Sequence, residues 1–255
     1  MPTVMDKKIN VENLREEIRK PVRILTERLL NDFGDNIKSI ALIGSALTED
    51  FHPTRSDINS FVLIEHENRE QLKTLAGYGQ QFGKMRIHAP VIMTQEFLAK
   101  SIDVFGIEFL DFQLNHKVVY GLDVFSDMKF DKSHVRLQCE RELRTVQIQL
   151  WQGYIRGLGL EKNVEPLLMD CAGKLLTLFR AMLWLMDIDR AKETKTTLEM
   201  TGVAFGFDEK IIAALLNLRR KETHRGADIV DLMFWDVYQI VVHLAKLTDK
   251  LGTNR

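Results

Sequence analysis

The chain has 255 residues, 35 lysines and arginines against 36 aspartates and glutamates, and a formal net charge of -1. This length allows one large domain or two small ones, and the balanced charge argues against a dedicated nucleic-acid binder. Its two cysteines, Cys139 and Cys171, exclude a disulfide scaffold. Because residues 1–10 lack the apolar core of a secretory signal and no apolar run reaches about 18 residues, we expect a cytoplasmic protein without a membrane partner.

The first half alternates helical and extended patterns. Apolar residues at three- and four-residue steps predict an amphipathic helix over 9–33, which Pro21 would kink or divide into two, and Gly34 would end it. Short apolar runs predict strands at 40–43, 58–65 and 85–93, with a helix at 69–78 between the second and the third. Pro90 predicts that the third strand lies at an edge, or ends there.

The second half is helical. Continuous helix-forming segments cover 134–156, 166–187, 208–222 and 228–251, and three tryptophans in them are expected in the core of a bundle, namely Trp151, Trp184 and Trp235. We therefore predict an α+β protein, in which a mixed sheet with flanking helices (1–125) is followed by an all-α helical bundle (126–255).

One motif carries a specific chemistry. A buried strand ends in Gly44-Ser45, where the glycine lets a phosphate approach the backbone and the N–H groups and hydroxyl donate hydrogen bonds to it. A second strand opens with Asp57, whose side chain shares a face with Asn59 because side chains alternate along a strand. Oxygen ligands at that position are suited to Mg²⁺ on a triphosphate.

These residues resemble the nucleotidyltransferase superfamily that includes DNA polymerase beta and the kanamycin nucleotidyltransferases. Gly44, Ser45 and Asp57 match its pattern, and the helical second half is typical of the kanamycin type. The resemblance implies that Gly44 and Ser45 bind the phosphates of an NTP, and that Asp57 and Asn59 stand at the catalytic position. Asp57 would bind Mg²⁺, and a nucleoside monophosphate would pass to an unidentified acceptor, either a small molecule or a protein.

The carboxylates depart from the family pattern. Asn59 stands in place of the second acid, and no aspartate or glutamate occurs between Gln71 and Gln95, where the third should lie and Arg86 and His88 occur instead. A neutral amide neutralises no metal charge. Two hypotheses follow: a divergent enzyme, or a degenerate one that acts as a nucleotide-binding regulatory module, with homodimerisation open in both.

Three other acids lie close enough in the sequence to be considered as replacements. Glu49 and Asp50 follow the Gly-Ser pair and could turn toward the phosphates, whereas Glu65 lies roughly 25 Å along the strand from Asp57, which excludes it. The alternative without function is that Gly44-Ser45 is a simple turn and Asp57 a cap.

The residues after position 105 offer weaker candidates. Glu108 and Asp111 share a helix face and, with His116, could supply an acid or base to the acceptor. We favour the interpretation that these acids form the solvated side of a segment whose Phe109 and Phe112 are buried.

Charged residues at four-residue steps begin the helical half. Kanamycin nucleotidyltransferases carry a glutamate base at the start of their helical part, a place that Glu140 or Glu142 could fill. We prefer a salt-bridge ladder that joins Arg136, Glu140 and Arg144.

Arg219 and His224 resemble the Arg-x4-6-His motif of the HEPN helical domains, some of which are ribonucleases. The resemblance implies, as an alternative function, a ribonuclease that uses Arg219 and His224. Lys174 is expected to extend from its helix to solvent, and the cysteines are too far apart in sequence to suggest zinc.

Overall fold

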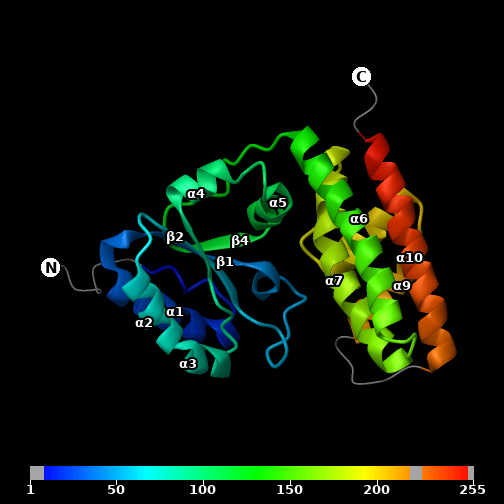
Figure 1. Cartoon of the computed structure of the whole chain (residues 1–255). Helices are drawn as coiled ribbons and strands as arrows, with labels where there is room; N and C mark the ends of the chain where they lie inside the picture. Colours follow the sequence, from blue (N-terminus) through cyan, green and yellow to red (C-terminus); the bar gives the residue numbers. More distant parts are fainter. Residues whose placement is uncertain (1–8, 219–225, 252–255) are drawn as a thin grey trace. The chain divides into compact units, whose positions relative to one another are not determined.

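The computed structural model describes residues 9–218 and 226–251. The chain forms two compact units, of which unit 1 holds residues up to 102 together with 112–129, and unit 2 holds 103–111 together with the residues from 130 onward (Figure 1). The domains predicted at 1–125 and 126–255 remain a prediction, and the segment 103–111 packs with unit 2.

Unit 1 contains the predicted mixed sheet, in the strand order β3-β2-β1-β4. Strand β1 pairs in antiparallel fashion with β2 and β4, and β2 pairs in parallel with β3. The strand bounds are Ile37–Ile43 (β1), Asn59–Ile64 (β2), Val91–Thr94 (β3) and His116–Gly121 (β4).

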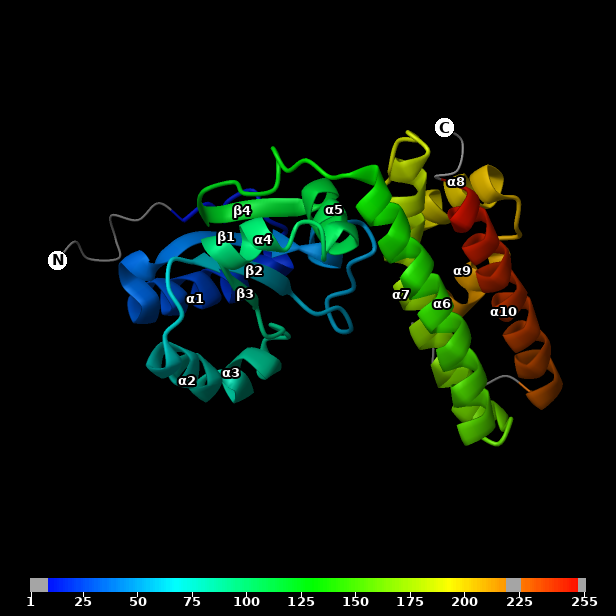
Figure 2. The same cartoon turned by 45° about the horizontal axis from the view of Figure 1, so that its top comes forward.

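Side-chain alternation divides the sheet into two apolar faces. Ile40 and Leu42 of β1 and Val62 of β2 pack in one buried cluster with α1 (Glu16–Phe33). Helices α2 (Arg69–Gly77) and α3 (Gly79–Lys84) lie on the side of the sheet where α1 lies (Figure 2). On the other face, the Phe61 and Phe125 rings are 4.9 Å apart between centroids.

The first helix corrects one expectation. Helix α1 begins at Glu16 and contains Pro21, so the proline neither starts nor divides it, and residues 9–15 precede the helix. Pro21 is only the sixth helical residue, so its missing N–H affects a single hydrogen bond near the amino end.

The later strands were only partly predicted. The segment 85–93 pairs continuously only from Val91, and Ile87 forms a single bridge to Ile58. Pro90 directly precedes an edge strand, as expected. Strand β4 was missed, because its six residues, HKVVYG, begin with the basic pair His116 and Lys117.

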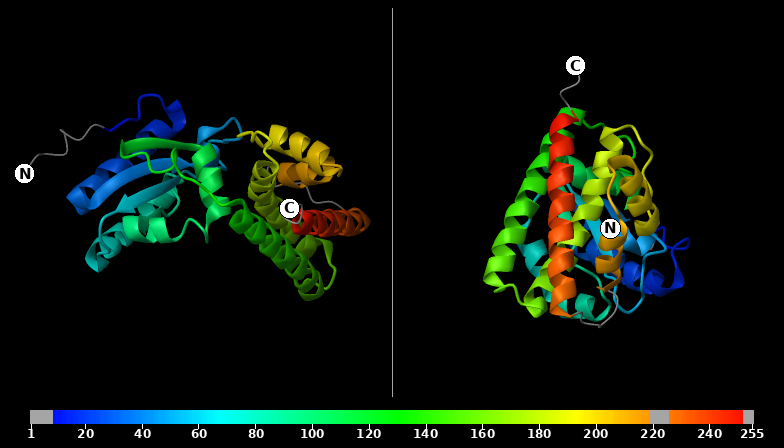
Figure 3. Two further views of the ribbon diagram at one scale, coloured as in Figure 1. Left: turned by 90° about the horizontal axis from the view of Figure 1, so that it is seen from above. Right: turned by 90° about the vertical axis from the view of Figure 1, so that its right-hand side faces the viewer.

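Unit 2 is helical. Its helices α6 to α10 surround a buried core that includes Leu143, Leu175 and Val241, and α5 begins in this unit and ends in unit 1 (Figure 3). The bounds are Gly106–Leu114 (α5), Lys132–Arg156 (α6), Glu161–Leu185 (α7), Thr194–Phe205 (α8), Lys210–Leu218 (α9) and Ala227–Lys250 (α10). The short helix α4 (Gln95–Lys100) belongs to unit 1.

Two tryptophans contradict their predicted place in the core. Trp151 is 52% exposed and Trp235 is 46% exposed, whereas Trp184 is partly buried against the core cluster. Across the described part of the chain, no helix has the length and apolar character that a membrane crossing requires.

Candidate nucleotide-binding site

The Gly-Ser pair forms the turn at the end of β1. Gly44 has a φ of +76° and opens a 3₁₀ turn that extends to Leu47. A Cβ at Gly44 would meet only the Asn59 side chain, at 3.6 Å, so the backbone angle, not lack of space, requires glycine here. Asn115, which directly precedes β4, holds the turn, since its side-chain amide nitrogen donates to the Gly44 carbonyl oxygen at 2.9 Å.

The acidic residue lies at the same end of the sheet. Ile43, the last residue of β1, pairs with Asn59, the first residue of β2, and Asp57 precedes Asn59 by two residues. The structure therefore places the four predicted residues, Gly44, Ser45, Asp57 and Asn59, at one end of the two inner strands of the sheet. Their functional roles remain predictions.

Arg86 binds Asp57. Its Nη2 lies 3.0 Å from Asp57 Oδ1, and its Nε donates to the Ser56 carbonyl oxygen at 3.0 Å. Nη2 also donates to the Arg55 carbonyl oxygen. Arg86 has a φ of 56°, unusual for a residue with a side chain, and its own carbonyl oxygen accepts from the Ile58 N–H at 2.7 Å.

The donor set does not fit a two-metal centre. The family pattern provides three carboxylates, whereas here one carboxylate is bound to a guanidinium and an amide replaces the second. Nowhere in the described ranges do three metal-ligating side chains of histidine, cysteine, aspartate or glutamate gather into a group, so Glu49 and Asp50 do not complete such a site.

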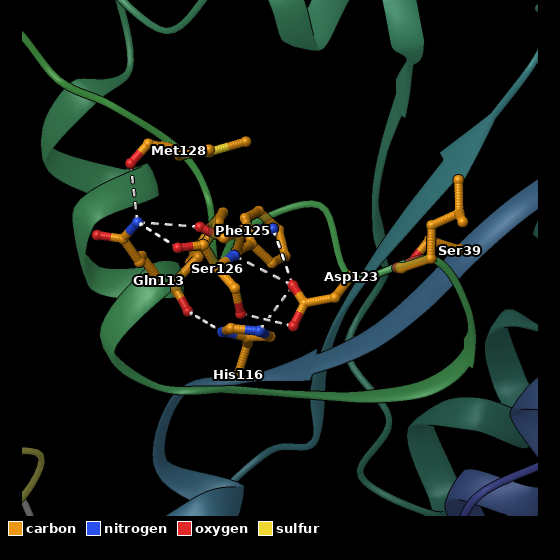
Figure 4. Close-up of polar contacts among 9 residues, drawn as sticks. Ser39, Gln113, His116, Asp123, Phe125, Ser126 and Met128 are labelled. Carbon is orange, nitrogen blue, oxygen red and sulfur yellow. Dashed lines mark hydrogen bonds and ion pairs between the residues drawn. The ribbon is translucent and has the colours of Figure 1, made fainter.

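A hydrogen-bonded network borders the site on β4. His116, which pairs with Ile43, places its Nδ1 2.8 Å from the Phe112 carbonyl oxygen and its Nε2 3.1 Å from Asp123 Oδ1 (Figure 4). The Asp123 carboxylate also accepts from the Ser126 hydroxyl at 2.6 Å.

Asp123 is the strongest acid of this network. Partial burial by itself would raise its pKa, but hydrogen bonds from Ser126, Phe125 and His116 outweigh burial and lower the pKa to about 2. Sequence reasoning missed this network. The Asp-x-x-Ser spacing after β4, in which an aspartate accepts from backbone N–H groups two and three residues later, could have indicated the turn.

The candidates Glu108 and Asp111 lie on α5 in different surroundings. Asp111 is not solvated as expected, because its carboxylate pairs with Arg180 at 2.8 Å, where both side chains are largely buried. Partial removal from water raises the pKa of Glu108, and the negative charges of Glu142 and Asp111 add to that shift. His116 belongs to the network of unit 1, so the structure does not join these three residues in one site.

The remaining expectations in unit 2 are partly confirmed. Arg136 and Glu140 pair at 3.0 Å, although Arg144 adds no ion pair among the described residues. Lys174 is exposed and donates to Gln149 at 2.9 Å. Arg219 and His224 lie outside the described residues.

The comparisons with known proteins concern the fold. No protein-family model and no curated sequence matches the chain. Its structure is similar to that of proteins with a nucleotidyltransferase fold. One is the spectinomycin adenyltransferase of Enterococcus faecialis, solved with ATP and spectinomycin: identity is 12%, the TM-score is 0.54, and the match covers 92% of this chain and 99% of that chain. The resemblance noted in the Gly-Ser motif thus extends to the fold of the chain.

Proposed function

We propose that the protein binds a nucleoside triphosphate at the Gly44-Ser45 turn, at the end of β1, without a divalent metal, and that it does not transfer the nucleotide. The ion pair between Asp57 and Arg86 carries this proposal. Where the family pattern has a cluster of carboxylates that would bind cations, this site has a neutral ion pair that includes the guanidinium cation of Arg86.

Arg86 is suited to bind phosphate. Guanidinium groups donate hydrogen bonds in a planar fork that matches phosphate oxygens. Nε and Nη2 of Arg86 are occupied, whereas Nη1 has no hydrogen-bond partner within the part of the chain that the structure describes. A phosphate oxygen can therefore bind Nη1 while the contacts that hold the side chain remain in place.

The turn at Gly44 would supply the other contacts. Its backbone N–H groups and the half-buried Ser45 hydroxyl lie at the end of β1. Arg86 lies on the other side of β2 from β1, next to the bridge between Ile87 and Ile58. Backbone N–H groups at such turns bind anions in many phosphate sites. Loss of the second and third carboxylates removes the charge that would hold two Mg²⁺ ions, and for this reason we propose binding without turnover.

Isothermal titration of ATP in EDTA tests the proposal. ATP is the probe because the adenyltransferase of similar fold was solved with it. We expect the wild type to bind, Arg86→Gln to lose at least about tenfold in affinity, which is 1.4 kcal/mol, and Arg86→Lys to retain part of it. Arg23→Gln is the matched control, because Arg23 also forms a partly exposed ion pair, with Glu12 at 2.8 Å, but on α1.

Pyrophosphate release in Mg²⁺ distinguishes the enzyme hypothesis. Sustained release that Asp57→Ala abolishes would establish an active nucleotidyltransferase and overturn the proposal. Absence of ATP binding both in EDTA and in Mg²⁺ would also refute it, since then the fold alone would be retained.

A further inference from the structure

Unit 2 exposes a group of large apolar side chains on two neighbouring helices and in the turn that follows the first of them. We call it the α6–α10 face, and its residues are 41–78% exposed: Ile148 59%, Trp151 52%, Ile155 69%, Leu158 78%, Leu160 41%, Leu232 66% and Trp235 46%. Helices α6 and α10 lie side by side, green and orange-red in the right panel of Figure 3. Monomeric proteins rarely expose apolar patches of more than a few hundred Å², and larger ones mark interaction sites.

The face is a second apolar stripe, separate from the core. Ile148, Trp151 and Ile155 follow one another at steps of three and four residues, as on one side of a helix. The stripe that α6 buries in its own unit consists of other residues, among them Val146 and Leu150. Helix α6 is thus apolar on two sides, whereas a helix at the surface of a monomer needs only one apolar side.

The aromatic residues of the face are held in fixed positions. The Trp151 and Tyr238 rings lie 5.8 Å apart, Trp235 lies 6.0 Å from Tyr238, and the Tyr154 hydroxyl donates to Asp231 at 2.8 Å. Rings that are already ordered lose little conformational entropy on association, which favours binding through them. Tryptophan and tyrosine are also enriched among the residues that dominate interface energies.

We propose that the α6–α10 face is the interface of a homodimer. Trp151 lies beside Tyr238 and Tyr154 beside Asp231, so α6 and α10 run antiparallel, and this helix pair is one half of a four-helix bundle. A second copy, turned by a two-fold axis parallel to the helices, would supply the other half, with α6 of one copy opposite α10 of the other.

Charge at the rim of the face favours a second copy. Exposed Arg156 ends α6, and exposed Asp228 and Asp236 lie on α10 on either side of Leu232; none of them has an ion-pair partner within the described residues. The two-fold places Arg156 of one copy near Leu232 of the other, within one helical turn of both aspartates. Each interface would therefore form two sets of opposite charges, while the charge of -1 on the chain opposes self-association only weakly.

The size of the face agrees with a small dimer. The two half-exposed tryptophans offer roughly 200 Å² of apolar surface, and the five exposed aliphatic side chains add roughly several hundred Å² more. A stable interface buries about 800 Å² per partner. The centre of the face is apolar and aromatic and the charges lie at its rim, as is common in homodimers.

Sedimentation velocity over a wide range of protein concentration tests the inference. We expect a wild-type dimer and a monomeric Leu232→Glu variant with an unchanged circular dichroism spectrum. Val203→Glu, on α8 and 87% exposed, is the matched control and should remain dimeric. Wild type that is monomeric throughout, or a Leu232→Glu variant that still dimerises, would overturn the inference.

A charge exchange tests the arrangement of the helices. Arg156→Glu should raise the dimer dissociation constant about tenfold or more, and Arg156→Glu combined with Asp236→Arg should recover most of that loss. If the double variant dissociates further than either single variant, α6 does not face α10 of the second copy.

Discussion

Replacing Gly121 by alanine tests how closely β4 approaches β1, the contact that holds Asn115 and His116 beside the Gly44 turn. Gly121 has a φ of +76°, and a Cβ on it would lie 2.0 Å from the Lys38 carbonyl oxygen. Gly206, which follows α8, is the matched control, since its φ of +71° and ψ of +48° are left-handed and a Cβ there meets nothing beyond its chain neighbours within 4 Å.

The two substitutions share one cost and differ in another. A left-handed backbone costs alanine about 1–2 kcal/mol, partly offset by about 0.4–1 kcal/mol from the reduced entropy of the unfolded chain, so we expect a loss of about 1 kcal/mol for Gly206→Ala. At Gly121 the strands must also separate. The hydrogen bonds from Leu122 N to Lys38 O (3.1 Å) and from Ser39 Oγ to Leu122 O (2.6 Å) would then break. At about 1 kcal/mol each, they bring the loss for Gly121→Ala to about 3 kcal/mol.

Hydrogen–deuterium exchange in increasing urea, followed by mass spectrometry, measures the loss for Gly121→Ala on peptides from β1 and β4 and the loss for Gly206→Ala on peptides from α8. Tryptophan fluorescence would not report on β1 and β4, because all three tryptophans lie in unit 2. Equal losses for both variants would show that close approach at Gly121 is not what requires glycine there.

Three further predictions concern other parts of the chain. Burial raises the pKa values of Cys139 and Cys171 to about 12, so neither thiol should react with iodoacetamide at neutral pH until unit 2 unfolds; rapid labelling of the native protein would contradict their burial. The pKa of Asp123 is lowered to about 2, so its contribution to stability is present above its unfolded value of about 4 and is lost as the pH falls toward 2. Asp123→Asn should therefore unfold with a weaker dependence on pH in that range, measured by circular dichroism, and an unchanged dependence would count against the network around it. Asp111→Ala should destabilise unit 2 by about 3 kcal/mol, measured by fluorescence in urea, because it leaves the buried charge of Arg180 without its partner. Adding Arg180→Met should recover much of this loss. A loss in the double variant equal to the sum of the losses of the two single variants would contradict the pairing.

The strands β1 and β2 and the Gly44-Ser45 turn could be predicted because they follow from local patterns. The apolar run before Gly44 and the alternation after Asp57 define two strands, and a two-strand hairpin brings the ends together. Strand β4 could not be found in this way, because its position depends on pairing with β1 some 70 residues earlier and on the special backbone of Gly121.

The ion pair of Asp57 escaped prediction for a similar reason. The sequence shows Arg86 where the family pattern has a third acid, but its contact with Asp57 spans 29 residues and requires a left-handed backbone at Arg86. Trp151 and Trp235 were misplaced because periodicity shows that a helix face is apolar without showing what covers it. That same ambiguity conceals a dimer interface in any single sequence.

The most direct measurement compares the affinity for ATP in EDTA and in Mg²⁺ between the wild type and an Asn59→Asp, Arg86→Asp double variant that restores two acids to the site. The account predicts that the wild type binds ATP equally well in both conditions, while the double variant binds only with Mg²⁺. Binding by the wild type that disappears in EDTA would show that Asp57 holds a metal, and that Arg86 does not replace it.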